Sequence, residues 1–474
     1  MALLLHYTGQ DYISRGLLNT QLTPGSTSAI VEGCKTGKGF AFDESVDSGL
    51  NSLTTINDNT LTMSAWIRIT AQGVSGSIYT IFATSNGVQN QILFDVYDVN
   101  RLRLVIIFAD NSAEVCDSIT NNSIQINTWY HVAASINKTT RLIQLYINGS
   151  RVNTFTYTNK PLQNGGRFFV GRRLYDKPFN GQICNLKVYN HVLSAREIAE
   201  DYKSLMLHYK LDKPITTQVF DHSGFNRHIA VIENTTTNST NEKRVYGGSL
   251  ANDGTKSLYG SLNLSELNGI NEISVAVRFR FISQAGTHCY FSSRTVVSGN
   301  GINLFKVGGT SRDVYVDIAG RNTFTLPYDL VTGTWYDLVA VKSVTQVKLY
   351  INSVLVGTIA NTNSISNMGQ LYASISRSVA EDYLPLINTM NGNVQDIRFY
   401  AKALTQSEVT ELYQTRHMVD KSSNCHTYEL IEGQTTVGMK ANGQLYCDEV
   451  IEGDDGVFQI VSNKKLKTKE IKEI

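Results

Sequence analysis

The connection GRRLYDKPFNG, residues 171–181, carries the side chains best suited to contact a ligand. Arg172, Arg173, Tyr175 and Asp176 lie close together there, directly before a strand-like apolar run. Arginine and aromatic side chains can stack on sugar rings, and binding residues commonly lie on connections of this kind. These four residues therefore form a candidate glycan contact surface. The alternative is that Tyr175 only covers the edge of a sheet.

A second connection, SRSVAEDYLPLINTMNG at residues 376–392, precedes a run of the same strand-like type. It carries Arg377, Asp382 and Tyr383. The chain thus offers two candidate contact surfaces, each just before a long apolar strand.

Motifs for catalysis or phosphate binding are weak in this sequence. The run GCKTGKGF from Gly33 resembles a phosphate-binding loop, but it is one residue short and lacks Ser or Thr after Lys38. A glycine-rich turn into a strand explains it better. The sequence has no HExxH and no GxSxG run. His131 lies in the alternating run WYHVAASI, which favours an ordinary strand residue over a ligand.

An internal repeat organises most of the chain. NGQICNLKVYNHVLSAREIAEDY begins at Asn180, and NGNVQDIRFYAKALTQSEVTELY begins 211 residues later at Asn391. LLLHY at Leu3 matches LMLHY at Leu205, and TWYHVA at Thr128 has a counterpart in TWYDLV. The two copies therefore share one fold, with insertions confined to loops.

Each copy has the pattern of an antiparallel β protein. RLIQLYING and QVKLYINS alternate apolar and polar residues, which is typical of a strand with one buried face. Asn148-Gly149 is a strong hairpin signal, and Asn352-Ser353 takes its place in the second copy. Many short strands at such spacing predict a sandwich of two sheets. We expect Trp66, Trp129 and Trp335 to be core residues of these strands.

Each copy closes with a short helix. Ser194 stands three residues before Glu197, and Thr405 three before Glu408, which are the spacings of capping boxes. The apolar residues that follow share one helical face, so we expect each helix to close its sandwich as a structural element without a catalytic role.

Taken together, the motifs LHY, GKGFAFD, TWYHVA, LYING and NLKVYNHVLSAREI resemble the laminin G-like, or concanavalin A-like, lectin/glucanase family. The resemblance implies an all-β fold with two tandem jelly rolls, at residues 1–204 and 205–416. Because that fold hosts lectins, hydrolases and adhesion modules, it leaves the ligand open.

The resemblance also implies a candidate calcium site. Many laminin G-like domains hold Ca²⁺ at the sandwich rim through Asp and backbone carbonyl oxygens. The candidates are Asp95 and Asp98 in FDVYDVN, and Asp313 and Asp317 in DVYVDIAG. The alternative, which we favour, is that they are isolated surface carboxylates.

A hydrolase is not expected. Glucanases of this family resemble one another in an E-x-D-x-E run, which places two carboxylates on one face of a strand. The sequence lacks such a run, and the charged stretch DESVD at Asp43 follows a strand in a polar region. We therefore predict that the protein is not an enzyme.

Residues 417–474 differ from both copies. Asn442-Gly443 between TVGMKA and QLYCDEVI predicts one tight hairpin. So short a segment would struggle to form its own core, so we expect it to pair with other subunits, in a homo-oligomer or a larger structure. It is similar to the ends of some tailed-bacteriophage structural proteins.

Composition excludes some classes of partner and compartment. The formal net charge of +1 offers no electrostatic footprint for nucleic acid or an anionic membrane. No apolar run approaches the roughly 20 residues of a transmembrane helix, and the first residues do not have the pattern of a signal peptide. The 6 cysteines lack zinc spacing, which favours buried free thiols and folding in a reducing host cytoplasm.

The sequence thus predicts a non-enzymatic structural or adhesive protein with two lectin-like modules. The main prediction is a phage virion decoration or tail-associated protein, displayed on the virion surface and contacting a host surface polysaccharide. The alternatives are a carbohydrate-binding protein related to glycoside hydrolases and a bacterial adhesin at the cell surface or outside the cell.

Overall fold

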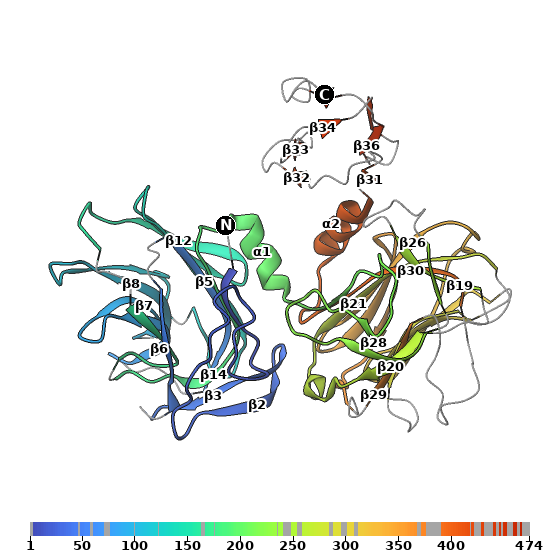
Figure 1. Cartoon of the computed structure of the whole chain (residues 1–474). Helices are drawn as coiled ribbons and strands as arrows, with labels where there is room; N and C mark the ends of the chain where they lie inside the picture. The colour runs from blue at the N-terminus through green and yellow to red at the C-terminus, as the bar shows by residue number, and fades with distance from the viewer. Residues whose placement is uncertain are drawn as a thin grey trace.

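A computed structural model of the chain shows two β-sandwiches in tandem, with short strands beyond the second (Figure 1). It describes residues 3–45, 48–56, 60–70, 76–98, 100–121, 123–162, 166–174, 176–234, 236–239, 248–253, 258–283, 288–294, 301–307, 311–366, 371–375 and 390–417, and short strands between 419 and 466. None of the helices in these ranges is long and apolar enough to cross a membrane.

The first sandwich is built from fourteen strands and the helix that closes it. They are β1 Leu3–Tyr7, β2 Ala29–Cys34, β3 Gly37–Asp43, β4 Leu50–Ile56, β5 Leu61–Ile69, β6 Ile78–Ser85, β7 Asn90–Tyr97, β8 Arg101–Ile107, β9 Ala113–Asp117, β10 Tyr130–Asn137, β11 Leu142–Ile147, β12 Ser150–Thr156, β13 Gly166–Val170, β14 Asn180–Tyr189 and α1 Ala195–Lys203.

Two antiparallel sheets face each other in this sandwich. One has the order β12-β11-β10-β5-β14-β3-β2, with β1 also on β14, and the other has the order β4-β13-β6-β7-β8-β9. Alternating side chains such as Phe40, Ile67, Phe82 and Phe94 are fully buried between them. Burial of each such side chain contributes about 1.5–3 kcal/mol, which is what holds the sheets together.

The second sandwich repeats the arrangement with a longer outer sheet. Its elements are β15 Leu205–Tyr209, β16 Gln218–Val219, β17 Ile229–Asn234, β18 Thr237–Ser239, β19 Ser249–Asp253, β20 Leu258–Leu262, η2 Ser265–Leu267, β21 Ile273–Phe281, β22 His288–Arg294, β23 Gly301–Lys306, β24 Asp313–Asp317, β25 Arg321–Thr325, β26 Tyr336–Lys342, β27 Gln346–Ile351, β28 Val354–Ala360, β29 Leu371–Ile375, β30 Asn391–Tyr400 and α2 Gln406–His417.

The strand order shows what the second copy adds. Its sheet β18-β19-β30-β21-β26-β27-β28, with β15 on β30, matches the first sheet of sandwich 1. The other sheet, β16-β17-β20-β29-β22-β23-β24-β25, carries β16 and β17 beyond the strand that corresponds to β4. The two sandwiches therefore confirm the predicted all-β fold and differ at this edge.

The predicted hairpin turns are confirmed in both copies. Asn148 and Gly149 join β11 to β12 with φ values of 51° and 76°. Asn352 and Ser353 join β27 to β28 with φ values of 48° and 64°. Positive φ at both central residues is the two-residue turn that matches strand twist. Ser353 therefore occupies a conformation that favours glycine.

The capping boxes of both closing helices are confirmed as well. The Glu197 backbone N–H donates to Ser194 Oγ at 3.2 Å, and the Ser194 N–H donates to Glu197 Oε2 at 2.7 Å. In α2 the Thr405 N–H donates to Glu408 Oε2 at 2.8 Å. Ile198 then packs into a buried cluster on the outer face of the sheet. Each helix covers one sheet, as predicted.

The outer face of that first sheet also holds a tryptophan and two cysteines. Trp66 is buried against Cys34 and Cys184 beneath α1, outside the space between the sheets. With Cys116 and Cys289, these are the four described cysteines, and all are buried and free. The prediction of buried free thiols is confirmed for these four.

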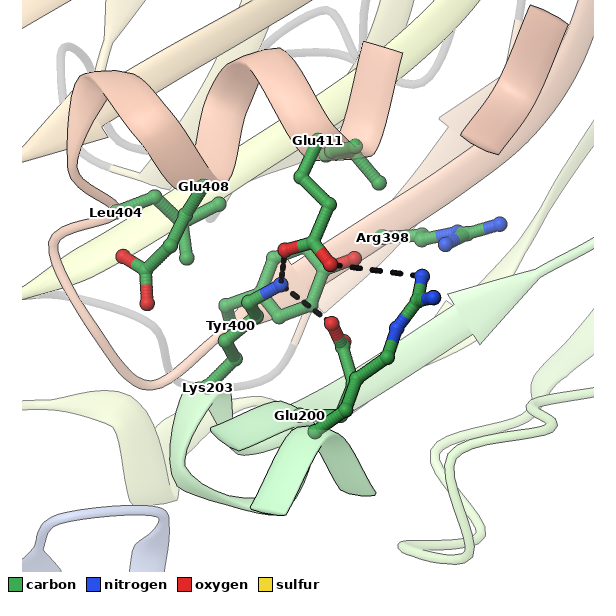
Figure 2. Close-up of a pocket in the computed structure, with 9 residues that line it drawn as sticks. Glu200, Lys203, Arg398, Tyr400, Leu404, Glu408 and Glu411 are labelled. Carbon is green, nitrogen blue, oxygen red and sulfur yellow. Dashed lines mark hydrogen bonds and ion pairs between the residues drawn. The ribbon is translucent and has the colours of Figure 1, made fainter. Parts of the chain in front are cut away.

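Only Ser204 separates α1 from β15, so the sandwiches follow one another without a linker. In Figure 2, Lys203 lies between Glu200 of α1 and Glu411 of α2. Its Nζ is 2.5 Å from Glu200 Oε1 and 2.6 Å from Glu411 Oε2. Burial lowers the pKa of Lys203, but the two glutamates outweigh it and hold it above its ordinary value. Arg196 also pairs with Glu411 at 3.5 Å. The cavity of about 100 Å³ between the helices is thus lined by paired charges.

A second set of contacts joins the sandwiches near η2. Arg227 donates to Glu266 at 2.5 Å and to the Thr36 carbonyl of the first sandwich at 2.8 Å. Lys35 pairs with Glu272 at 2.5 Å. Because Arg227 is only 3% exposed, this contact between the two sandwiches is shielded from solvent.

The C-terminal strands differ from the expected hairpin. They are β31 Val419–Asp420, β32 Tyr428–Leu430, β33 Met439–Ala441, β34 Leu445–Tyr446, β35 Glu449–Glu452, β36 Phe458–Val461 and β37 Lys465–Leu466.

The predicted hairpin, in which β33 would pair with β34 across Asn442-Gly443, is wrong. Among the described residues β33 pairs with β32, and β34 pairs with β37. The consecutive strands that pair antiparallel are instead β32 with β33 and β35 with β36. Asn-Gly favours a turn, but strands of two or three residues have too little alternation to fix which partner they take.

Candidate functional site

The first sandwich brings a predicted contact residue onto a predicted calcium ligand. Arg173 Nη2 donates to Asp95 Oδ2 at 3.0 Å. Arg103, opposite Asp95 on β8, donates from Nε at 2.8 Å and from Nη2 at 2.9 Å. The Arg103 guanidinium also lies 3.8 Å from the centre of the Tyr97 ring. Asp95 is 0% exposed, and its buried carboxylate accepts hydrogen bonds from both arginines. We call Asp95, Arg103 and Arg173 the Asp95 cluster.

The other predicted contact residues of this connection lie apart from Asp95. Arg172 donates to Asn51 Oδ1 from Nε at 3.1 Å and from Nη2 at 2.7 Å, and lies 5.6 Å from the Phe169 ring. Asp176 is exposed. The remaining predicted residues lie outside the described part of the chain: Tyr175, Arg377, Asp382 and Tyr383.

The other calcium candidates lie in hydrogen-bonded positions. Asp98 accepts from the Gly76 N–H at 3.0 Å and from Arg101 Nη2 at 3.4 Å. Asp313 accepts from Thr325 Oγ1 at 2.6 Å. Within the described ranges, no three His, Cys, Asp or Glu side chains converge to hold a metal ion.

The favoured alternative of isolated surface carboxylates is wrong for Asp95 and Asp317, which are 0% and 1% exposed and paired with arginines. Calcium binding stays an untested prediction for the four residues.

In the second sandwich, the sheet that runs from β16 to β25 carries a different set of side chains from the Asp95 region of the first. Phe305 on β23 and Tyr315 on β24 are directly opposite in register, with ring centres 4.9 Å apart. Arg321 of β25 lies over both rings, at 5.7 and 5.1 Å. It donates to Asp317 from Nε at 3.1 Å and from Nη2 at 3.2 Å. We call Phe305, Tyr315, Asp317 and Arg321 the aromatic shelf.

The aromatic shelf is partly exposed to solvent, whereas the carboxylate of the Asp95 cluster is buried. The Arg321 side chain is 55% exposed and both rings are half-buried, whereas Asp317 lies 1% exposed behind them. The hydrogen bond to Asp317 raises the pKa of Arg321, so this arginine stays charged. An accessible ring pair beside a fixed guanidinium can stack on a sugar ring and donate to its hydroxyl groups.

Sequence reasoning missed Phe305, Tyr315 and Arg321, although a signal was present. Alternation in NLFKV and DVYVD places Phe305 on one face of its strand and Tyr315 with Asp317 on one face of theirs. What the sequence does not contain is the register between β23 and β24, which brings the rings together.

A buried charged cluster beneath α1 has the residue types of a catalytic site but the wrong arrangement. Asp201 bonds to Ser64 and Lys187, and lies 3.3 Å from His131 Nε2. Burial raises the pKa of Asp201, but Lys187 and His131 outweigh it and hold it far below its ordinary value. Ser64 donates to the aspartate instead of to the histidine, so no serine nucleophile is activated. The cluster anchors α1 on the sheet.

Comparison with known families agrees with this architecture. The family model described as the concanavalin A-like lectin/glucanases superfamily matches residues 43–199 and 253–410, which is more than half of the chain. The chain therefore belongs to the concanavalin A-like lectin/glucanases superfamily, and it carries the domain twice. No curated protein matches the chain.

Solved structures similar to this chain include single and paired domains. Domain 4 of a GH43 extracellular arabinanase from Geobacillus stearothermophilus, in complex with arabinotriose, is 18% identical, with 44% of this chain and 98% of that chain covered and a TM-score of 0.34. The CBM40 of the Ruminococcus gnavus IT-sialidase, bound to α2,3 sialyllactose, is 15% identical over 38% and 97%, with a TM-score of 0.28. The botulinum neurotoxin type G receptor binding domain is 12% identical over 86% and 98%, with a TM-score of 0.37.

Proposed function

We propose that this protein binds glycans without hydrolysing them, and that the aromatic shelf of the second sandwich is its contact surface. Membership of a lectin/glucanase superfamily supports the class of ligand. The observation that carries the proposal is the accessible pair of rings of Phe305 and Tyr315 beneath the exposed guanidinium of Arg321.

Each group of the shelf has a distinct part in this proposal. The C–H face of a pyranose ring packs on the part of Phe305 and Tyr315 that Arg321 leaves exposed, and Arg321 donates to hydroxyl oxygens at the edge of the sugar. Asp317 fixes the guanidinium by two hydrogen bonds, so little conformational entropy is lost when a sugar binds. The Asp95 cluster, whose carboxylate is fully buried, contributes structure to the first sandwich in this account.

The test is equilibrium binding of the full chain to a panel of bacterial surface polysaccharides. Removal of one ring, in Phe305→Ala, is expected to weaken binding about tenfold, since partial burial of an aromatic ring contributes about 1.5 kcal/mol. Tyr328→Ala is the matched control, because that ring is 42% exposed in the same sandwich and has no ring or cation contact with the residues of the shelf among the described contacts. Equal binding by the wild type and Phe305→Ala would contradict the proposal.

The absence of an E-x-D-x-E run in the sequence supports the non-enzymatic part of the proposal. Incubation of the same polysaccharides with the protein should release no reducing ends. Repeating the binding in calcium and then in chelator tests the calcium prediction for Asp95, Asp98, Asp313 and Asp317. Loss of binding in chelator would support metal ligation by one of these pairs.

Display of the sandwiches through residues 417–474 is a further part of the proposal. We propose that this segment attaches the protein to other subunits, on a virion or, as the alternative, at a cell surface. Superfamily membership supports glycan contact and is silent on the virion. A chain ending at His417, the last residue of α2, should keep both sandwiches folded but lose oligomerisation. Early melting of the shortened chain would instead mean that the segment completes the second sandwich.

A further inference from the structure

One of the two strands that only the second sandwich carries, β16, borders a pocket at the edge of its sheet. β16 is the edge strand, and residues 210–215, which follow β15, lie beside it. Between them is a cavity of about 290 Å³. That volume is at the small end of ligand pockets, with room for a single sugar residue.

The pocket has an apolar floor and an exposed aromatic ring at its rim. Leu211 is 4% exposed and Val219 is 3% exposed, and Ile215 packs against the core of the sandwich. Phe220 follows β16 and is 61% exposed, with its ring 5.6 Å from that of His228. A ring this exposed is available to a ligand that enters the pocket.

Positive charge gathers around the same cavity. Lys210, Lys213 and His222 line it, and Asp212 is its one acidic side chain. Burial and then the charge of Lys210 lower the pKa of His222, Asp212 and Asp221 act in the opposite direction, and Lys213 lowers it by a smaller amount. Both lysine charges therefore act on one point of the rim. Lys213 is exposed and has no ion-pair partner among the residues that the structure describes.

The first copy has different side chains at the corresponding positions. In the matched runs LHYTGQD and LHYKLDK, Thr8 stands for Lys210 and Asp11 for Lys213. Asp11 is paired with Arg15 at 2.5 Å. The second copy thus has a lysine that lines a cavity where the first copy has an ion-paired aspartate.

We propose that this pocket binds a carboxylated sugar residue of an acidic polysaccharide, independently of the aromatic shelf. The C–H face of the sugar packs on Phe220 above Leu211 and Val219, and its carboxylate pairs with Lys213. An ammonium and a carboxylate form a charge-assisted hydrogen bond, while the apolar floor favours a ring over a free inorganic anion. The ligand class is therefore a uronic or sialic acid.

The probes are digalacturonate, glucuronate and N-acetylneuraminate, each titrated into the full-length protein by calorimetry. At least one should bind, and Lys213→Ala should weaken that binding about tenfold, the effect of one charge-assisted hydrogen bond. Phe220→Ala should weaken it as well. Lys138→Ala is the control, because it removes an exposed lysine from a turn of the first sandwich.

Further arms separate this pocket from the aromatic shelf. The carboxyl-reduced form of the bound probe should fail to bind, and Phe305→Ala should leave binding of the acidic probe unchanged. Binding that survives Lys213→Ala, or that Phe305→Ala abolishes, would overturn the assignment to this pocket. Failure of all three probes would overturn the ligand class, whatever the outcome for neutral glycans at the shelf.

Discussion

We predict that Arg227, which makes a buried contact across the junction, helps to hold the two sandwiches in one orientation. It belongs to the second sandwich, where Nη1 donates to the Met206 carbonyl at 2.7 Å and Nε pairs with Glu266 at 2.5 Å. Its Nη2 donates across the junction to the Thr36 carbonyl at 2.8 Å. Replacement by Met keeps the length of the side chain and removes every one of these donors.

The expected cost follows from the burial of this arginine. The Arg227 side chain is 2% exposed and that of Glu266 is 10% exposed, so Arg227→Met leaves a buried carboxylate without its cation. Loss of one partner of a buried ion pair costs about 3–5 kcal/mol. Gln10 still donates to Glu266 at 3.0 Å, which favours the lower end of that range. We expect the free energy of unfolding to fall by about 3 kcal/mol.

Chemical denaturation measures that free energy, and small-angle X-ray scattering measures the arrangement of the sandwiches. Arg227→Met should lower stability and produce scattering that a single orientation no longer fits. Arg312→Ala is the matched control, because Arg312 is exposed and, within the described ranges, its side chain donates only to the Pro327 carbonyl at 3.2 Å. A loss below about 1 kcal/mol with unchanged scattering would refute the reasoning that Arg227 holds the junction.

Other predictions concern the sandwiches themselves. Burial lowers the pKa of His6 to about 3. The contribution of neutral His6 to the free energy of unfolding is therefore complete above pH 6.5 and falls by up to about 5 kcal/mol as the pH drops toward 3. Denaturation of His6→Gln at several pH values should lack this pH dependence. Asp201→Asn strands the Lys187 charge and should cost about 3–5 kcal/mol, and an unchanged melting curve would contradict that. Ser353→Gly should add about 1 kcal/mol in urea denaturation and Gly149→Ser remove a similar amount, and shifts of the same sign would contradict the turn geometry.

Much of the fold could be predicted from the sequence because it depends on local patterns. Alternation in RLIQLYING predicts a half-buried strand, Asn148-Gly149 predicts the turn after it, and Ser194 with Glu197 predicts the start of α1. The repeat strengthened these predictions, since each signal occurs twice. All of them are confirmed.

The candidate sites could be predicted only in part because they depend on pairing between distant residues. Arg173 was chosen as a contact residue, but its pairing with Asp95, 78 residues away, became visible only in the fold. Similarly, the register of β23 and β24 decides that Phe305 meets Tyr315. No local pattern in the sequence encodes such a register, which follows from the packing of the whole sheet.

Hydrogen–deuterium exchange of the full-length protein, with and without the polysaccharide that it binds best, tests the central claim most directly. The account predicts slower exchange in β23, β24 and β25, where the aromatic shelf lies, and unchanged exchange there in Phe305→Ala. Protection confined to the first sandwich, or no polysaccharide that binds at all, would contradict the assignment of the shelf as a glycan contact surface.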